Sequence, residues 1–390
     1  MFESLKRRIK HLDVSLIICY VLLGVVGVIM VYSASMVSAS KGSLTNGVPV
    51  AANYFMKRQF LFFIMGFLVI LFISMFININ AIKNVEIQKF IVLSTLSLLL
   101  LTILVGKEVN GSKNWISLGI FSIQSSEFLK LASIFYLSYI IDKFLALKKD
   151  YKLRHLIPPL GVLGLGLLLV LMQGDLGGTL LTVAIIGSIL LYSEIKNKIK
   201  LQILSFTAIP MLLYICYTLI FDSKNLYRLK RIQVVLDPFK YENGDGYQLT
   251  SALTSIANGG LFGKGLGNGI LKRGYLPEPH TDFIFTVISE ETGLIGVLFV
   301  LAIYGFILFK GLVYANRTEN HFYKLICVGV VSYLFMQVFI NLAGISGLIP
   351  LTGVTLPMLS YGGSSIMSVS LALGAMIAVI RKIKQEQITK

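Results

Sequence analysis

The chain has few charged residues for its length. Only 14% of its 390 residues are Asp, Glu, Lys or Arg, whereas soluble domains carry about 25%. Hydrophobic residues make up 55% and the mean hydropathy is +0.79, so the composition excludes an ordinary soluble domain. Three cysteines, all in apolar segments, exclude a disulfide framework and a CxxC metal motif. Of four histidines only His280 lies in a dense polar motif, which excludes a multi-histidine metal site.

Much of the sequence consists of long apolar runs. Runs of about 16 to 24 residues recur along the chain, and a bilayer core of about 30 Å requires ~20 helical residues. Backbone groups in lipid must pair internally, and a barrel would show alternation, so we predict helices. The ten predicted spans are 15–38, 57–79, 89–106, 124–142, 157–172, 177–193, 199–221, 283–309, 322–342 and 361–380. The predicted fold is therefore all-α, a single polytopic membrane domain over 1–390 that contains one long loop, 222–282.

Acidic residues are scarcer than basic ones. Thirty-five Lys and Arg against 19 Asp and Glu give a net charge of +16. The excess of basic residues lies before span one, between spans four and five, between spans six and seven, and after span ten. With ten spans, all these segments lie on one side of the membrane. The positive-inside rule makes that side cytoplasmic, so both termini are inside and loop 222–282 is outside. Topology and anionic lipid account for this charge, so it does not indicate nucleic-acid binding. The first span is too long for a removable signal peptide.

The densest polar motif of the chain lies where loop 222–282 enters span eight. It contains His280 and Asp282, and ionisable groups at such a boundary are costly to keep. The stretch before it is rich in glycine and carries Lys272 and Arg273. Two interpretations of this stretch remain open: a solvated loop with turn glycines, or an anion-binding surface of backbone N–H groups.

Four further outer segments carry polar or turn-forming residues. Trp115, the single tryptophan, is either an interfacial anchor or part of a substrate surface. Span four opens with Glu127 and Lys130, whose i,i+3 spacing places them on one helix face. That pair is either a structural ion pair or a contact of the lysine with a lipid phosphate. Asp175 separates spans five and six. The uncharged, Pro- and Gly-containing loop 344–365 predicts a segment partly buried in protein.

Six motifs, in this number and order, resemble those of the SEDS family, which covers the FtsW, RodA and SpoVE proteins of bacterial cell-wall synthesis. They are Asn110 to Ile116, Gln124 to Lys130, Gly174 to Gly177, Gly259 to Gly263, Leu276 to Phe285 with Glu290 and Glu291, and Leu359 to Ser365. The resemblance begins in the first span, at Tyr32 to Ser35, and extends to the last. The FtsW branch of low-GC Gram-positive bacteria is the most similar.

This resemblance implies a ten-helix peptidoglycan glycosyltransferase that polymerises lipid II on the outer face of the cytoplasmic membrane. An FtsW-type protein would act at the division septum, and a RodA-type protein in elongation. The implied partners are lipid II, a class B penicillin-binding protein that crosslinks the product, and other divisome proteins. By motif, the family's essential aspartate corresponds to Asp282 and its loop tryptophan to Trp115. Its Glu/Lys pair corresponds to Glu127 and Lys130, and its GDLG carboxylate to Asp175.

The chemistry of such a reaction fits these residue types. A sugar hydroxyl must attack an anomeric carbon while a lipid diphosphate departs. Asp282 is the candidate base, a role that contributes about 10²–10⁴-fold, and His280 is a candidate to orient it. Glu290 is a further candidate substrate contact. Candidates to stabilise the diphosphate are Lys113, Lys130, Arg231, Lys272 and Arg273.

Two details concern charge at the diphosphate. Lys113 stands where many relatives carry arginine. Lysine keeps the positive charge but lacks the bidentate fork of arginine, which is suited to phosphate. A divalent cation, Mg²⁺ or Mn²⁺, held by the diphosphate and a carboxylate is a further candidate. No organic cofactor is expected.

Two other functions remain open. A flippase that moves lipid II across the membrane is compatible with the polytopic fold, with Asp175 and with the pair Glu127 and Lys130. A scaffold that only recruits the transpeptidase would leave the His280–Asp282 motif without a role. Ionisable and glycine-rich motifs are concentrated on the outer side, which favours the polymerase.

Overall fold

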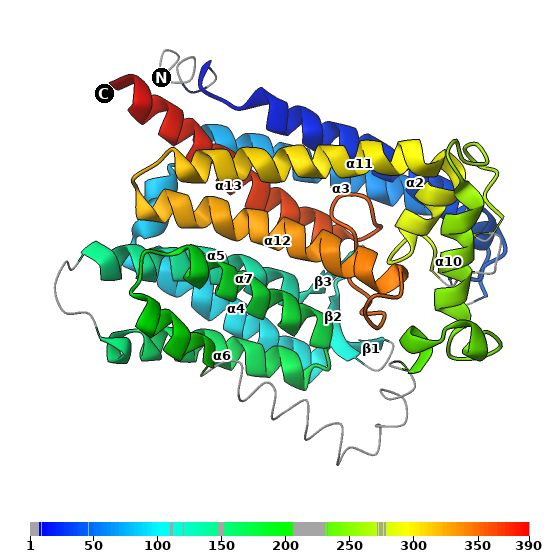
Figure 1. The fold of residues 1–390 in the computed structure, drawn as a ribbon, viewed down its shortest axis with the longest axis horizontal. Coiled ribbons are helices and arrows are strands. Elements are labelled where there is room, and N and C mark those ends of the chain that lie inside the picture. Colours follow the sequence, from blue (N-terminus) through cyan, green and yellow to red (C-terminus); the bar gives the residue numbers. More distant parts are fainter. Residues whose placement is uncertain are drawn as a thin grey trace.

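The structure of the chain is a computed structural model. It describes residues 8, 10–45, 47–109, 112–119, 121–146, 152–205, 231, 233–270, 272, 276 and 278–389. Over these residues the chain forms a bundle of long helices with a small antiparallel sheet near one end (Figure 1). The prediction of an all-α, polytopic fold is confirmed.

Within the described ranges, nine long helices correspond to nine of the ten predicted spans. They are α2 (Val14–Ser40), α3 (Tyr54–Phe76), α4 (Val85–Val105), α5 (Ser125–Ala146), α6 (Ile157–Met172), α7 (Leu176–Tyr192), α11 (Ile284–Asn316), α12 (His321–Ile345) and α13 (Gly363–Thr389). Among the residues described, six helices are long and apolar enough to cross a membrane, and α6 and α7 are shorter apolar helices. The predicted span 199–221 lies mostly outside the described residues.

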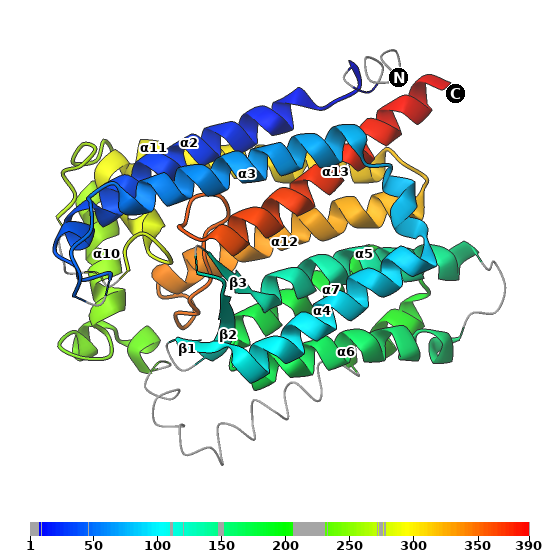
Figure 2. The same ribbon diagram turned by 180° about the vertical axis from the view of Figure 1, so that it is seen from behind.

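The helices surround α13. Figures 1 and 2 show α13 running through the middle of the bundle, where it packs against α3, α5 and α12. Its buried face is built from small and branched side chains such as Ala372, Ala375 and Val379, which allow neighbouring helices to approach closely. The outer helices expose large apolar side chains, for example Leu104 on α4 and Phe309 on α11, as lipid-facing surfaces do.

Ion pairs close one end of the bundle, where α2 begins and α13 ends (Figure 1). Asp13 is buried and lies 2.8 Å from both Lys310 Nζ and Lys384 Nζ. Burial alone would raise the pKa of this carboxyl, but the two ammonium groups hold it well below its usual range. Arg381 donates to main-chain oxygens at the end of α3, including Met75 O at 2.8 Å. These contacts tie α2, α3, α11 and α13 together.

The opposite end contains two elements that the sequence did not predict. A three-stranded antiparallel sheet is formed by β1 (Lys107–Val109), β2 (Ser112–Ser117) and β3 (Ser122–Gln124). The helix α10 (Tyr247–Gly259) lies within the long loop and packs against α11. Short helical turns η1 (Ile79–Lys83), η2 (Leu153–His155) and η3 (Phe239–Tyr241) complete the described elements.

The loop between α12 and α13 returns into the bundle at the same end (Figure 1). Residues 356–360 are all buried. Its carbonyls are paired with side chains of neighbouring helices, for example Ser360 O with Gln59 Nε2 of α3 at 3.1 Å. The prediction that this uncharged loop is partly buried in protein is therefore confirmed.

Candidate active site

Asp282 lies on a turn directly before α11. Three successive carbonyl oxygens of this turn accept hydrogen bonds from α12 or from the α12–α13 loop. The pairs are His280 O with Tyr361 N (2.8 Å), Thr281 O with Ser360 Oγ (2.7 Å), and Asp282 O with Asn341 Nδ2 (2.9 Å). The main chain that carries the carboxylate is thus fixed at three consecutive positions.

The Asp282 carboxylate itself is half-buried and, among the described residues, meets no hydrogen-bond donor of the protein. Burial raises the pKa of Asp282 to about 7, and the nearby charge of Glu278 adds to the rise. A base with a pKa near neutrality is matched to proton transfer at ordinary working pH. The carboxylate is therefore free to accept a proton from a bound substrate.

Gly353 of the α12–α13 loop faces this carboxylate. Its φ of +70° lies in the region that side-chain-bearing residues rarely adopt. A Cβ at this position would lie 3.4 Å from Asp282 Oδ2. Glycine here both permits the turn and leaves the space beside the carboxylate open.

His280 packs as an aromatic ring beneath the turn. Its ring centroid lies 4.6 Å from that of Phe55 and 5.3 Å from that of Tyr361. Burial lowers the pKa of His280 to about 4, so the imidazole is neutral at neutral pH. Its Nδ1 is buried and has no hydrogen-bond partner within the described part of the chain. These contacts support the turn, and a role in orienting Asp282 stays a prediction.

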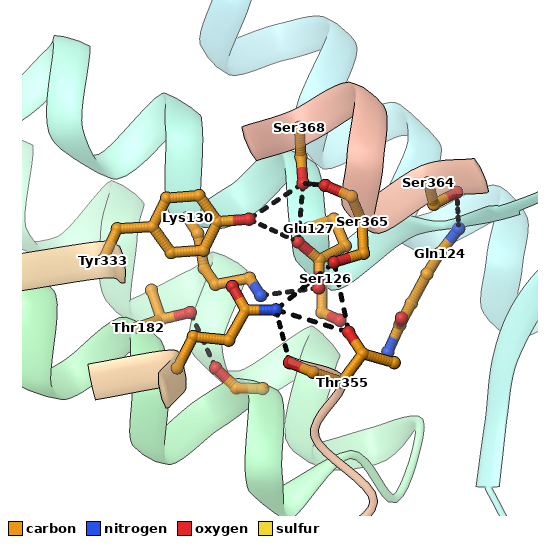
Figure 3. Close-up of polar contacts among 12 residues, drawn as sticks. Gln124, Ser126, Glu127, Lys130, Thr182, Tyr333, Thr355, Ser364, Ser365 and Ser368 are labelled. Atoms are coloured by element: carbon orange, nitrogen blue, oxygen red, sulfur yellow. Dashed lines mark hydrogen bonds and ion pairs between the residues drawn. The ribbon is translucent and has the colours of Figure 1, made fainter. Parts of the chain in front are cut away.

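Glu127 and Lys130 form an ion pair inside the bundle (Figure 3). Lys130 Nζ lies 2.6 Å from Glu127 Oε1, and the side chains are 2% and 5% exposed. Glu127 Oε2 accepts hydrogen bonds from Tyr333 OH and Ser368 Oγ, both at 2.7 Å. Of the two interpretations of this pair, the geometry favours the structural one, because both charges are enclosed by protein. Contact of Lys130 with a lipid phosphate stays a prediction.

Asp175 caps the first turn of α7. Its Oδ1 accepts from Gly178 N at 2.7 Å, and its Oδ2 accepts from Ser126 Oγ at 2.7 Å and Gln124 Nε2 at 3.2 Å. A carboxylate is favourable at a helix N-terminus, where backbone N–H groups lack partners. Asp175 therefore joins the start of α7 to the start of α5, and its predicted contact with substrate is not tested by this geometry.

Trp115 and Lys113 lie on the central strand β2. Trp115 is half-buried and pairs with Lys107 on one side and Gln124 on the other. Lys113 Nζ donates to Leu104 O at 3.3 Å, in the last turn of α4, where a cation is favourable. The sheet thus places the tryptophan next to the start of α5.

Glu290 of α11 and Lys272 of the preceding loop lie in a cluster of ion pairs. Lys272 Nζ pairs with Glu291 Oε1 and lies 2.6 Å from Ser33 Oγ of α2, while Lys264 Nζ lies 3.2 Å from Glu290 Oε1. Each carboxylate in this cluster has a lysine partner within the protein. Substrate contacts of Glu290 and Lys272 stay predictions, and Arg273 lies outside the described residues.

The glycine-rich segment packs its backbone onto α11 next to this cluster. A Cβ on Gly259 would lie 2.0 Å from Ser289 O, and one on Gly263 would lie 2.2 Å from Glu291 O. α11 is kinked at Gly293, whose φ is +65°. These glycines are explained by backbone-to-backbone packing, a reason that neither interpretation of the sequence had considered.

Sequence reasoning missed a set of polar residues on α12. Tyr333, Gln337 and Asn341 are buried, and their spacing of four places them on one helix face. The signal was present, since polar side chains repeated at this spacing within an apolar span rarely face lipid.

Comparisons with known proteins agree with this architecture. The family model described as "Cell cycle protein", for FtsW, RodA and SpoVE, matches residues 13–386. The chain is 38% identical over 378 residues to the "Probable peptidoglycan glycosyltransferase FtsW" of Bacillus subtilis (strain 168), covering 95% of this chain and 90% of the relative. It is 36% identical over 377 residues to "Stage V sporulation protein E" of the same organism, covering 95% and 97%.

Solved structures share the fold. A chain from a study titled "Structural coordination of polymerization and crosslinking by a peptidoglycan synthase complex" matches with a TM-score of 0.74 and 25% identity, over 96% of this chain and 99% of that one. The rod shape determining protein RodA of Thermus thermophilus matches with a TM-score of 0.66 and 24% identity, over 95% and 97%. The chain belongs to the FtsW/RodA/SpoVE family, a family of multi-pass membrane proteins.

Proposed function

We propose that this protein is a peptidoglycan glycosyltransferase that polymerises lipid II into glycan strands, with Asp282 as the catalytic base. Curated relatives that share most of its length carry the name peptidoglycan glycosyltransferase. The observation that carries the proposal is the Asp282 carboxylate. It is held on a fixed turn, lacks a protein donor among the described residues, and has a pKa of about 7.

In this reaction a hydroxyl of the acceptor sugar attacks the anomeric carbon of the donor. The new glycosidic bond forms as the bond to the lipid diphosphate breaks, and the diphosphate leaves with the bonding electron pair. Asp282 takes the proton of the attacking hydroxyl. The open space that Gly353 leaves beside Oδ2 is where that hydroxyl would lie.

Positive charge near the departing diphosphate would lower the barrier. Arg231 is suited to this because its Nη1 donates to Leu351 O at 3.0 Å, two residues before Gly353, and its side chain is exposed. The side chains of Lys130 and Lys272 are buried instead, at 2% and 1% exposed. We therefore propose that Arg231, in preference to these two lysines, is the cation that contacts the diphosphate.

A divalent cation is a further part of the proposal. The described residues contain no group of three His, Cys, Asp or Glu that could hold a metal ion. A cation would therefore need the substrate's diphosphate together with Asp282, a combination that suits Mg²⁺, which often binds through one or two carboxylates and substrate phosphates. Bound there, it would neutralise charge on the leaving group.

We further propose that both termini are cytoplasmic, that the end with the sheet and α10 faces outward, and that the protein acts at the division septum. The positive-inside rule supports the orientation, and the FtsW relatives support the septal site. A matched structure comes from a complex that coordinates polymerization and crosslinking. This supports a class B penicillin-binding protein as partner, together with other divisome proteins.

Polymerisation of lipid II by the purified protein, alone and with its transpeptidase partner, tests the proposal. Wild-type protein should yield glycan polymer and Asp282→Asn should yield none. The control is Asp142→Asn, which removes a carboxylate at the other end of the bundle, 2.9 Å from Lys83, and should remain active. Wild-type protein that moves lipid II between leaflets of vesicles but forms no polymer would instead support the flippase.

A further inference from the structure

The polar face of α12 has no role in the function proposed above. Tyr333, Gln337 and Asn341 are 0%, 0% and 3% exposed, within a helix whose other residues are mostly apolar. Buried polar groups are costly unless they are hydrogen-bonded. The partners of these three side chains therefore indicate why they are there.

The contacts of this polar face run from the buried ion pair to the turn of Asp282. Tyr333 OH donates to Glu127 Oε2 at the inner end of the face (Figure 3). Gln337 Nε2 lies 3.1 Å from Thr355 O and 3.3 Å from Ser365 Oγ. At the other end Asn341 reaches the turn itself. One helix face thus contacts α5, α13, the α12–α13 loop and the candidate base.

We propose that Asn341 is a positioning residue for Asp282, which it holds against the α12–α13 loop. Its single Nδ2 donates to two carbonyl oxygens, Asp282 O at 2.9 Å and Val354 O at 2.7 Å. Val354 directly follows Gly353, the residue that faces the carboxylate. One amide group therefore sets the separation between the base and the loop across from it. This inference depends on the proposed role of Asp282.

The other contacts of the turn cannot replace Asn341. Tyr361 N and Ser360 Oγ hold the carbonyls of residues 280 and 281. The carbonyl of Asp282 is bonded, within the described residues, by Asn341. Loss of this bond leaves a peptide free to rotate next to the base, and a misplacement of about 1 Å costs on the order of 10²-fold in rate.

The chain offers a matched control in Gln88 of α4. Its side chain is also buried, donates from Nε2 to one carbonyl, Ile82 O at 2.7 Å, and leaves its amide oxygen without a partner in the described part of the chain. It lies at the opposite end of the bundle from the sheet. Gln88→Leu and Asn341→Leu therefore remove similar groups, one of them far from Asp282.

Lipid II polymerisation kinetics, thermal melting and a pH profile of kcat would be measured on both variants. Asn341→Leu should lower kcat about 10²-fold with KM changed less than about threefold, because the substrate contacts remain. Its pH profile should also shift, since the surroundings of the carboxylate change. Gln88→Leu should melt at a similarly reduced temperature but retain kcat and the wild-type pH profile. Asn341→Ser, which keeps one donor, should recover part of kcat.

Asp282→Asn measured alongside separates this inference from the function on which it depends. An active Asp282→Asn removes the base assignment, and with it any positioning role. An inactive Asp282→Asn together with an Asn341→Leu that keeps the kcat and pH profile of Gln88→Leu overturns the positioning role alone. Should Asn341→Leu fail to fold, Asn341→Ala decides, because it is smaller and has no side-chain donor: wild-type kcat and pH profile in that variant would also overturn the positioning role.

Discussion

Asp282→Asn should abolish polymerisation and, at the same time, stabilise the folded protein at high pH. The carboxyl has an ordinary pKa of 3.8, and burial raises it to about 7 in the folded protein. Because the folded state holds this proton more tightly than the unfolded chain, wild-type protein loses stability as the pH rises from about 4 to 7, by about 1.4 kcal/mol per unit. The full penalty, on the order of 4 kcal/mol, is present above pH 7. Asparagine does not ionise, so the variant does not lose this stability at high pH.

The size of this effect can be measured without knowing the separate cost of burying an amide. The difference in unfolding free energy between variant and wild type should widen in favour of the variant by about 2–3 kcal/mol between pH 5 and pH 8. Thermal or denaturant unfolding of the purified proteins at both pH values gives this difference. Asp142→Asn, which breaks an ion pair with Lys83, should show no such gain.

The same pKa predicts the pH dependence of the wild-type reaction. Since the deprotonated carboxylate is the base, kcat/KM should rise with pH through about 7. A stability difference that stays constant from pH 5 to pH 8, or a reaction that is fastest at pH 5, would refute the reasoning about Asp282.

Three further predictions concern other parts of the molecule. Trp115→Ala should cut polymerisation strongly while Trp115→Phe retains part of it, because a flat apolar surface is kept; equal and mild effects would favour an interfacial anchor. Glu127→Gln and Lys130→Met should each lower the free energy of unfolding by about 3–5 kcal/mol, since each leaves a buried charge without its partner. The charge swap should recover part of this loss, whereas a Lys130 variant that is stable but inactive would indicate a substrate contact. In a cysteine-free background, Asn243→Cys should react with a membrane-impermeant thiol reagent in intact cells and Lys198→Cys should not; the reverse pattern would overturn the proposed orientation.

The helices could be predicted well from the sequence because hydropathy is a local property. The predicted span 157–172 has the same bounds as α6, and the predicted span 57–79 differs from α3 by three residues at each end. The sheet was missed because its strands contain only three to six residues and depend on pairing across the loop. α10 was missed because it lies in a segment whose glycines suggested turns.

For the candidate site, the sequence supplied the residue types and the structure supplied their partners. Asp282 could be chosen from its position at a membrane boundary and from the motif around it. Whether Lys130 was paired or free could not be decided, because its carboxylate partner accepts hydrogen bonds from Tyr333 and Ser368, more than 200 residues away. The lysine partners of Glu290 and Glu291 could not be predicted either, because these contacts depend on how the preceding loop folds against α11.

The sequence by itself determined the membrane class, the positions of most helices and the family, since these depend on composition, on apolar runs and on short motifs. Only the tertiary structure decided which polar groups face one another. The pKa of Asp282, the space that Gly353 leaves beside it and the double hydrogen bond of Asn341 all arise from contacts between segments far apart in the chain. Burial and hydrogen bonding depend on distance in space, and a linear pattern does not contain that distance.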